Sequence, residues 1–194
     1  AQMRGCLLND DGVVQKYLDP DDWTSETLDG SAGQVMVHAP LDSYWRFEKD
    51  GNICRAKFSP TALPGFKRTP QGFLGSEEAT VQRSTNKLCS VVNKDADYRG
   101  GNNNSAWDGT YRSFLGMPAT AISRTNFRTY ARNRKSGSTE WNMNEYGLHK
   151  LLYWLAVVQY ATFNLQKPVN TEKDADGFSQ GGLGTGVTTI NYNK

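Results

Sequence analysis

The sequence predicts an α+β fold, in which a strand-rich first half is followed by two helices. Strand-like alternation begins at Gln34 and is clearest on either side of Asp50-Gly51. Two helical patterns follow, one over residues 124–134 and one from residue 144 or 145 to 164. With 194 residues, of which 37% are hydrophobic, the chain is long enough to bury the core of one large domain.

Residues 1–33 form an acidic, turn-rich segment. Asn9-Asp-Asp-Gly12, Asp19-Pro-Asp-Asp22 and Leu28-Asp-Gly30 have the Asx and Asp-Gly composition that is typical of turns. We expect this segment to wrap a core built by residues 34–194. Its carboxylates also suit Ca²⁺, but the complete calcium-loop pattern is absent, so solvated turns are the favoured interpretation.

The strand region contains a hairpin signal. Asp50-Gly51 separates the alternating runs 44–47 and 53–58, and the central residues of a tight hairpin turn need positive φ. We therefore expect an antiparallel pair there. Residues 59–75 form a connection broken by proline and glycine, and strand-like character resumes near its end.

Ser123 predicts where the first helix begins. A serine at this position can cap the helix over 124–134, and Ile122 against Phe127 fits a hydrophobic staple. The second helix carries apolar residues on nearly every side, which predicts packing on more than one face and a central place in the core.

The segment 98–112 combines amides, aromatic residues and glycines, and is too polar for a core. Amides donate and accept hydrogen bonds, and tryptophan and tyrosine offer flat area at low entropic cost, so this composition predicts a recognition surface. An ordinary turn region with its tryptophan folded onto the core explains the composition equally well. The candidate ligand-binding residues are Asn102, Asn103, Asn104, Trp107, Asp108, Tyr111 and Arg112.

Charge and cysteine content narrow the function classes. The net charge of +2 gives no field that would indicate nucleic acid as the partner, and no stretch is apolar enough to predict membrane insertion. Cys6, Cys54 and Cys89 lack metal-ligand spacing, and buried free thiols are favoured over a disulfide with one cysteine left over.

The glycine-rich end predicts no cofactor. Gly182-x-Gly184-x-Gly186 has no strand pattern before it and no helix pattern after it, so it fails as a nucleotide loop. Residues 172–177 begin like a calcium loop, but Leu183 stands where the closing acid belongs, which leaves a weak cation site at most. We expect no metal or cofactor.

A set of motifs resembles proteins of tail-fibre or receptor-binding type carried by gut-bacterial phages and prophages. The motifs are Gln82-Arg-Ser-Thr-Asn-Lys-Leu88, Ser90-Val-Val-Asn93, Asp97-Tyr-Arg-Gly-Gly101, Leu115-Gly116, residues 123–132, Trp141-Asn142, Leu152-Tyr-Trp154, Tyr160-Ala161 and Gln180-Gly-Gly-Leu-Gly184. The resemblance spans most of the chain from Gly33 onward. It implies a C-type-lectin-like domain over 34–194, related to formylglycine-generating enzymes, with two helices packed on a twisted antiparallel sheet and long irregular loops.

Two functional patterns of that wider fold family are missing. Calcium-dependent sugar binding uses Trp-Asn-Asp together with Glu-Pro-Asn or Gln-Pro-Asp, whereas Met143 follows Trp141-Asn142 and neither tripeptide occurs. The formylglycine-generating oxidases need a paired cysteine site late in the chain, whereas the last cysteine is Cys89. The resemblance therefore implies neither activity.

The resulting expectation is a non-enzymatic module of a phage or prophage tail fibre or adhesin, located on the virion tail or an extracellular surface. Its displayed loops would contact a bacterial surface receptor, either a glycan or a protein. The alternative is a structural virion or fibre subunit that uses the same loops for contacts within a homo-oligomer. Catalysis is disfavoured because the sequence offers two histidines, no Gly-x-Ser-x-Gly elbow and no evident carboxylate dyad.

Overall fold

The computed structural model of the chain describes residues 3–39, 43–92, 96–101, 104–109, 117–165 and 168. These residues form two α-helices and three antiparallel sheets, which confirms the α+β class. The chain divides into two compact units. One, the hairpin unit, is built mainly from residues 39–72 and 144–165, and the other, the sheet unit, from residues 4–38 and 73–143. In the described residues each unit has its own helix, whereas we expected both helices on one sheet.

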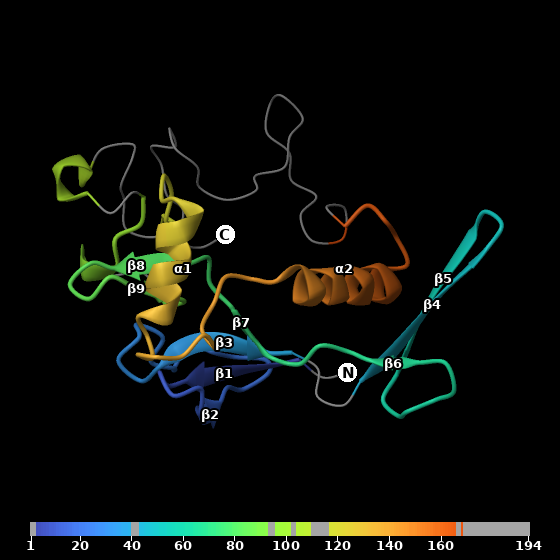
Figure 1. Cartoon of the computed structure of the whole chain (residues 1–194). Coiled ribbons are helices and arrows are strands. Elements are labelled where there is room, and N and C mark those ends of the chain that lie inside the picture. The colour runs from blue at the N-terminus through green and yellow to red at the C-terminus, as the bar shows by residue number, and fades with distance from the viewer. Residues whose placement is uncertain are drawn as a thin grey trace. The chain divides into compact units, whose positions relative to one another are not determined.

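The sheet unit contains a four-stranded antiparallel sheet and a separate short hairpin (Figure 1). The sheet has the order β2 (Val14–Tyr17), β1 (Arg4–Leu8), β3 (Gln34–His38), β7 (Phe73–Gly75), and the hairpin joins β8 (Thr80–Gln82) to β9 (Lys87–Cys89). Two short 3-10 turns, η1 (Ala96–Tyr98) and η2 (Ser105–Trp107), follow.

Strand β1 lies inside the sheet and supplies core on both of its faces. Cys6 packs with Met36 in one buried cluster, and Leu7 packs with Leu18 and Val35 in another. The prediction that this segment only wraps a core built elsewhere is therefore wrong for β1. A strand buried on both faces shows no polar alternation, so its pattern did not reveal it. The domain boundary after residue 33 stays a prediction.

The turn signals of the N-terminal segment are confirmed between β1 and β2. Gly12 adopts a φ of +80°, and the Asn9 side-chain oxygen accepts a hydrogen bond of 2.9 Å from the Val13 amide. Asn9 and Gly12 thus close the turn by the local chemistry that their types predict.

Helix α1 (Arg124–Arg132) begins where the capping residue predicted it. The Ser123 hydroxyl accepts a hydrogen bond of 3.2 Å from the Asn126 amide, which satisfies one free donor of the first turn. The helix packs against β9 of the same unit (Figure 1).

Arg134, just beyond α1, joins three parts of the sheet unit. Its guanidinium donates to the Asp10 carboxylate, to the Leu88 carbonyl at 2.6 Å and to the Cys89 sulfur at 2.8 Å. Lys87 also pairs with Asp10, at 2.7 Å. Because the Arg134 side chain is only 4% exposed, this cluster satisfies a buried charge and holds the end of α1 on β9 and the β1–β2 turn. We call these residues the Arg134 cluster.

The cysteine prediction holds in part. Cys6 and Cys89 are buried free thiols, as expected, but Cys54 is exposed. Cys54 lies near the turn end of a hairpin where its neighbours Ile53 and Arg55 are exposed as well, so no surrounding residues cover it.

The hairpin unit confirms the predicted antiparallel pair. β4 (Tyr44–Asp50) pairs with β5 (Ile53–Ser59), and β6 (Lys67–Arg68) pairs with the other side of β4. The turn lies one residue later than expected, because Asp50 pairs with Ile53 and leaves Gly51 and Asn52 as the loop. Gly51 has a φ of +56°, so the glycine occupies the first central position, as in type II′ turns.

Helix α2 (Tyr146–Tyr160) packs against β5 and ends at Ala161, whose φ is +51°. It is shorter than predicted, and within it only Leu151 and Val157 are buried. Val158 is 46% exposed, so the described residues do not show the expected central core helix. The reason is that the β4–β5 hairpin and the two-residue strand β6 can cover only a narrow strip of α2.

Replacing Arg134 with alanine is expected to lower the free energy of unfolding by about 2–3 kcal/mol. This value lies at or just below the usual cost of breaking a buried ion pair, because Asp10 remains partly solvated. Chemical denaturation followed by circular dichroism measures it. The control Arg132→Ala, on the exposed surface of α1, changes stability by less than about 0.5 kcal/mol, and an equal effect of both variants would contradict the role of the cluster.

The Arg134 cluster also predicts sensitivity to acid. Burial alone would raise the pKa of Asp10, but hydrogen bonds from Lys87 and the charge of Arg134 outweigh it and hold this pKa below its ordinary value. A carboxylate with a lowered folded-state pKa stabilises the fold above its unfolded pKa, and this stabilisation is lost as the pH falls below about 4.

We expect Asp10→Asn to flatten the loss of stability between pH 5 and pH 3, as measured by urea denaturation at each pH. The control Asp11→Asn changes a neighbouring exposed carboxylate and keeps the wild-type profile. Identical profiles for wild type and Asp10→Asn would show that this carboxylate does not contribute.

Candidate functional site

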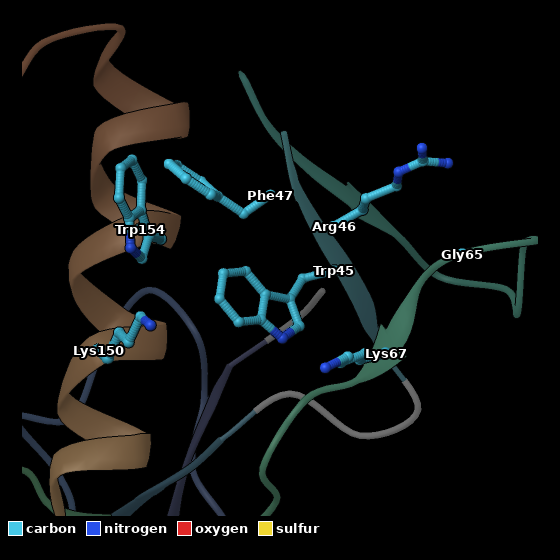
Figure 2. A pocket seen from close by; sticks show the side chains of 7 residues that line it. All are labelled: Trp45, Arg46, Phe47, Gly65, Lys67, Lys150 and Trp154. Carbon is cyan, nitrogen blue, oxygen red and sulfur yellow. The ribbon is translucent and has the colours of Figure 1, made fainter. Parts of the chain in front are cut away.

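An aromatic and cationic hollow of about 460 Å³ opens between β4 and α2 of the hairpin unit (Figure 2). We call it the aromatic hollow. Its lining residues are Trp45, Arg46, Phe47, Gly65, Lys67, Lys150 and Trp154.

The strand side of the hollow follows from the register of the hairpin. Alternate residues of a strand point to opposite faces, so Trp45 and Phe47 share a face while Arg46 lies on the other. In Figure 2 both aromatic side chains point toward α2, and Arg46 points away from it.

On the helix side of the hollow, two lining residues are four positions apart in the sequence. Lys150 and Trp154 are one turn apart on α2, which places both side chains on one face of the helix. Both meet the hairpin, because Trp154 contacts Phe47 and the Lys150 ammonium lies over the Trp45 ring.

Aromatic contacts connect the two sides. The rings of Phe47 and Trp154 lie 5.3 Å apart between centroids with a tilt of 52°, and Trp154 also meets Tyr153 edge-on at 5.5 Å. Phe47 nevertheless keeps 44% of its surface exposed. The aromatic groups are therefore held in place by one another while part of their area faces the solvent.

Two ammonium groups flank Trp45. The Lys150 Nζ lies 5.3 Å from the centroid of the indole, and Lys67 of β6 is the direct cross-strand partner of Trp45. In the described part of the chain, neither lysine has a carboxylate within salt-bridge distance. Their charges thus remain available at the hollow.

Arg46 is already engaged. Its guanidinium pairs with Glu48 at 2.8 Å on the opposite face of the hairpin. It also lies against Gly65, where an added Cβ would come within 2.9 Å of the guanidinium and φ is +77°. We therefore assign Arg46 a structural role beside the hollow.

The lining combines aromatic and cationic side chains. Its side chains offer flat apolar area and positive charge, and none of them is a carboxylate, histidine, cysteine or hydroxyl. Within the described residues, no group of three or more histidine, cysteine, aspartate or glutamate side chains could hold a metal ion.

The amide-rich segment predicted from the sequence lies in the sheet unit and is described only in part. Asn102, Asn103, Tyr111 and Arg112 fall outside the described residues. Asn104 is exposed, but its side-chain oxygen caps η2 by accepting a hydrogen bond from the Ala106 amide.

Asp108 accepts two hydrogen bonds from Arg83, at 2.8 and 2.9 Å, and Trp107 is half-buried. The structure thus brings Asn104, Trp107 and Asp108 together on one surface turn, where the polar groups of Asn104 and Asp108 hold the turn itself. Whether this segment binds a ligand stays a prediction.

A second hollow, of about 450 Å³, lies in the sheet unit against the Arg134 cluster. Its charged lining groups are Asp10, Lys87 and Arg134, and these satisfy one another. This internal pairing explains them as structural groups, so this hollow is the weaker candidate for a binding site.

The sequence does not identify the residues of the aromatic hollow as a site. It predicts Trp154 in a core helix, and it indicates Trp45 and Phe47 only as strand residues. The usable signals are the Trp-x-Phe alternation beside a hairpin turn and a lysine one turn before a tryptophan. Neither signal reveals that the two elements face each other.

Comparison with protein-family models, curated proteins and solved structures finds no match to this chain. Among the described residues, neither helix is long and apolar enough to cross a membrane. The site is therefore interpreted from its own geometry.

The contact between Phe47 and Trp154 predicts measurable energetic coupling. A double-mutant cycle with Phe47→Ala and Trp154→Ala is expected to give a coupling of about 0.5–1 kcal/mol in the free energy of unfolding, because tilted aromatic pairs contribute beyond their buried area. The control cycle combines Ile53→Ala with Trp154→Ala. In that cycle the two changes in the free energy of unfolding are expected to add within about 0.5 kcal/mol. Additive effects in the first cycle would show that the two rings do not meet.

Proposed function

We propose that the chain is a non-enzymatic recognition module of a phage or prophage tail fibre or adhesin, and that it contacts a glycan or protein on a bacterial surface. Its motifs from residue 82 onward resemble such proteins, and the proposal includes their C-type-lectin-like fold and a place on the virion tail or an extracellular surface.

The observation that carries the proposal is the aromatic hollow. Pockets that recognise ligands combine apolar and aromatic walls with a few placed polar groups, and this hollow has three aromatic walls and two available ammonium groups. Tryptophan is also the residue type most enriched at energetic centres of recognition surfaces. The amide-rich turn around Trp107 is the second surface through which the same function could act.

The test is a glycan array together with binding to whole gut bacteria. We expect the wild type to bind, and Trp45→Ala and Trp154→Ala each to weaken binding about tenfold, which corresponds to about 1.4 kcal/mol. Circular dichroism and thermal unfolding check that each variant folds. Trp107→Ala is the matched control for the other surface.

The outcomes distinguish the two surfaces from each other and from no recognition at all. If only Trp107→Ala loses binding, the recognition site lies on the amide-rich turn and not at the aromatic hollow. Absence of binding by the wild type to every glycan and every bacterium would remove the proposed function.

A second candidate function is that of a structural fibre subunit. Large apolar side chains are exposed on the hairpin unit, among them Ile53 (55%), Tyr146 (76%) and Phe163 (67%). Exposed apolar side chains that lie together are typical of surfaces that meet another protein, whereas singly scattered ones are ordinary on a monomer, so the oligomeric state distinguishes the two interpretations. A second copy of the chain would cover these side chains in a homo-oligomer.

Light scattering combined with size-exclusion chromatography tests the subunit hypothesis. We expect an oligomer that dissociates when Ile53 and Tyr146 are both replaced by lysine, because burying two new charges at an interface is costly. A wild type that is monomeric at about 100 μM would count against this candidate.

A further inference from the structure

The charge of the aromatic hollow points to a narrower class of ligand than its shape alone. Lys67 and Lys150 flank Trp45 from β6 and α2, and Figure 2 shows the indole between them. No acidic side chain lines the hollow. The nearest paired carboxylate on β4, Glu48, is held by Arg46 and Lys57 at 2.8 and 3.0 Å on the other face.

We propose that the aromatic hollow binds an acidic saccharide, with a sugar ring against its aromatic side chains and the sugar carboxylate held by Lys67 and Lys150. This inference rests on the proposed function and specifies its ligand. The ring and the carboxylate of one acidic sugar unit match the two kinds of group that the hollow presents.

Lys150 can exchange its present contact for the ligand. Its ammonium now lies over the Trp45 ring, and an exposed cation–π contact and an exposed ammonium–carboxylate pair contribute similarly small free energies, so the exchange itself costs little. Release from the indole also uncovers the aromatic face for the sugar ring. Binding of the anion and stacking of the ring therefore favour each other.

A saccharide is favoured over a nucleic acid by the amount of charge. Nucleic-acid binding draws on the neutralisation of several phosphates, whereas this hollow offers two available ammonium groups on a chain of net charge +2. Two ammonium groups suit a single carboxylate.

Isothermal titration with matched ligand pairs tests the proposal. The pairs are oligogalacturonate and its methyl ester, sialyllactose and its methyl ester, and hyaluronan oligosaccharides before and after carboxyl reduction. We expect at least one acidic member to bind about tenfold more tightly than its neutral counterpart, because only the acid can pair with the lysines.

Variants then separate the contributions of charge and stacking. Lys67→Gln is expected to lower affinity for the acid about five- to tenfold and to leave affinity for the neutral partner unchanged, whereas Trp154→Ala weakens both. Lys150→Gln is expected to lower the ratio of acidic to neutral affinity about five- to tenfold, because it removes a cation and also uncovers the Trp45 face for either sugar. Lys49→Gln, an exposed lysine of β4 that does not line the hollow, is the matched control and leaves both affinities unchanged.

Each failure has a distinct meaning. Equal affinity for acidic and neutral members, with dependence on Trp154, would overturn the acidic ligand and leave the recognition function standing. If the protein binds on the glycan array but no acidic member binds above its neutral counterpart, the acidic ligand is likewise overturned. Tighter binding of a thymidine octanucleotide through the same lysines would overturn the saccharide.

Discussion

The register of the β4–β5 hairpin is the constraint on which the candidate site depends. Gly51 closes the turn with positive φ, and at the other end the Ser43 and Thr69 hydroxyls meet at 2.6 Å in a buried contact that ties β4 to the end of β6. Because strand side chains alternate, a slip of one residue would turn Arg46 toward α2 and Trp45 away from it. The two ends of the hairpin therefore decide which chemistry the helix faces.

The two units use their polar groups differently. In the sheet unit the Arg134 cluster and the Asp108–Arg83 pair satisfy charges with other parts of the same unit, so these groups stabilise the fold. In the hairpin unit Lys67 and Lys150 keep their charge at a hollow with aromatic walls. Lys67 and Lys150 are exposed to solvent, so their charges add little to stability, and beside partly exposed aromatic area they suit recognition.

The proposed ligand binding and the alternative self-association would draw on the same feature of the hairpin unit, which is its exposed apolar area. The aromatic hollow differs from the apolar side chains beyond it, such as Tyr146 and Ile53, because lysines flank it. An apolar surface of a second copy would satisfy the outer side chains but would bury the two ammonium groups without partners. Under the proposed functions, the charge pattern therefore favours a ligand at the hollow and protein contact at the outer side chains.

The sequence by itself determined the features that depend on neighbours along the chain. The Ser123 cap, the Asn9–Gly12 turn and the hairpin near Gly51 were predictable because each is made by side chains and dihedral angles within a few residues. The tertiary structure alone decided that β1 lies inside the sheet, that Arg134 is buried and that Lys150 and Trp154 face Trp45. An apolar or charged residue type states what environment favours it, but contacts between segments a hundred residues apart decide which environment it receives.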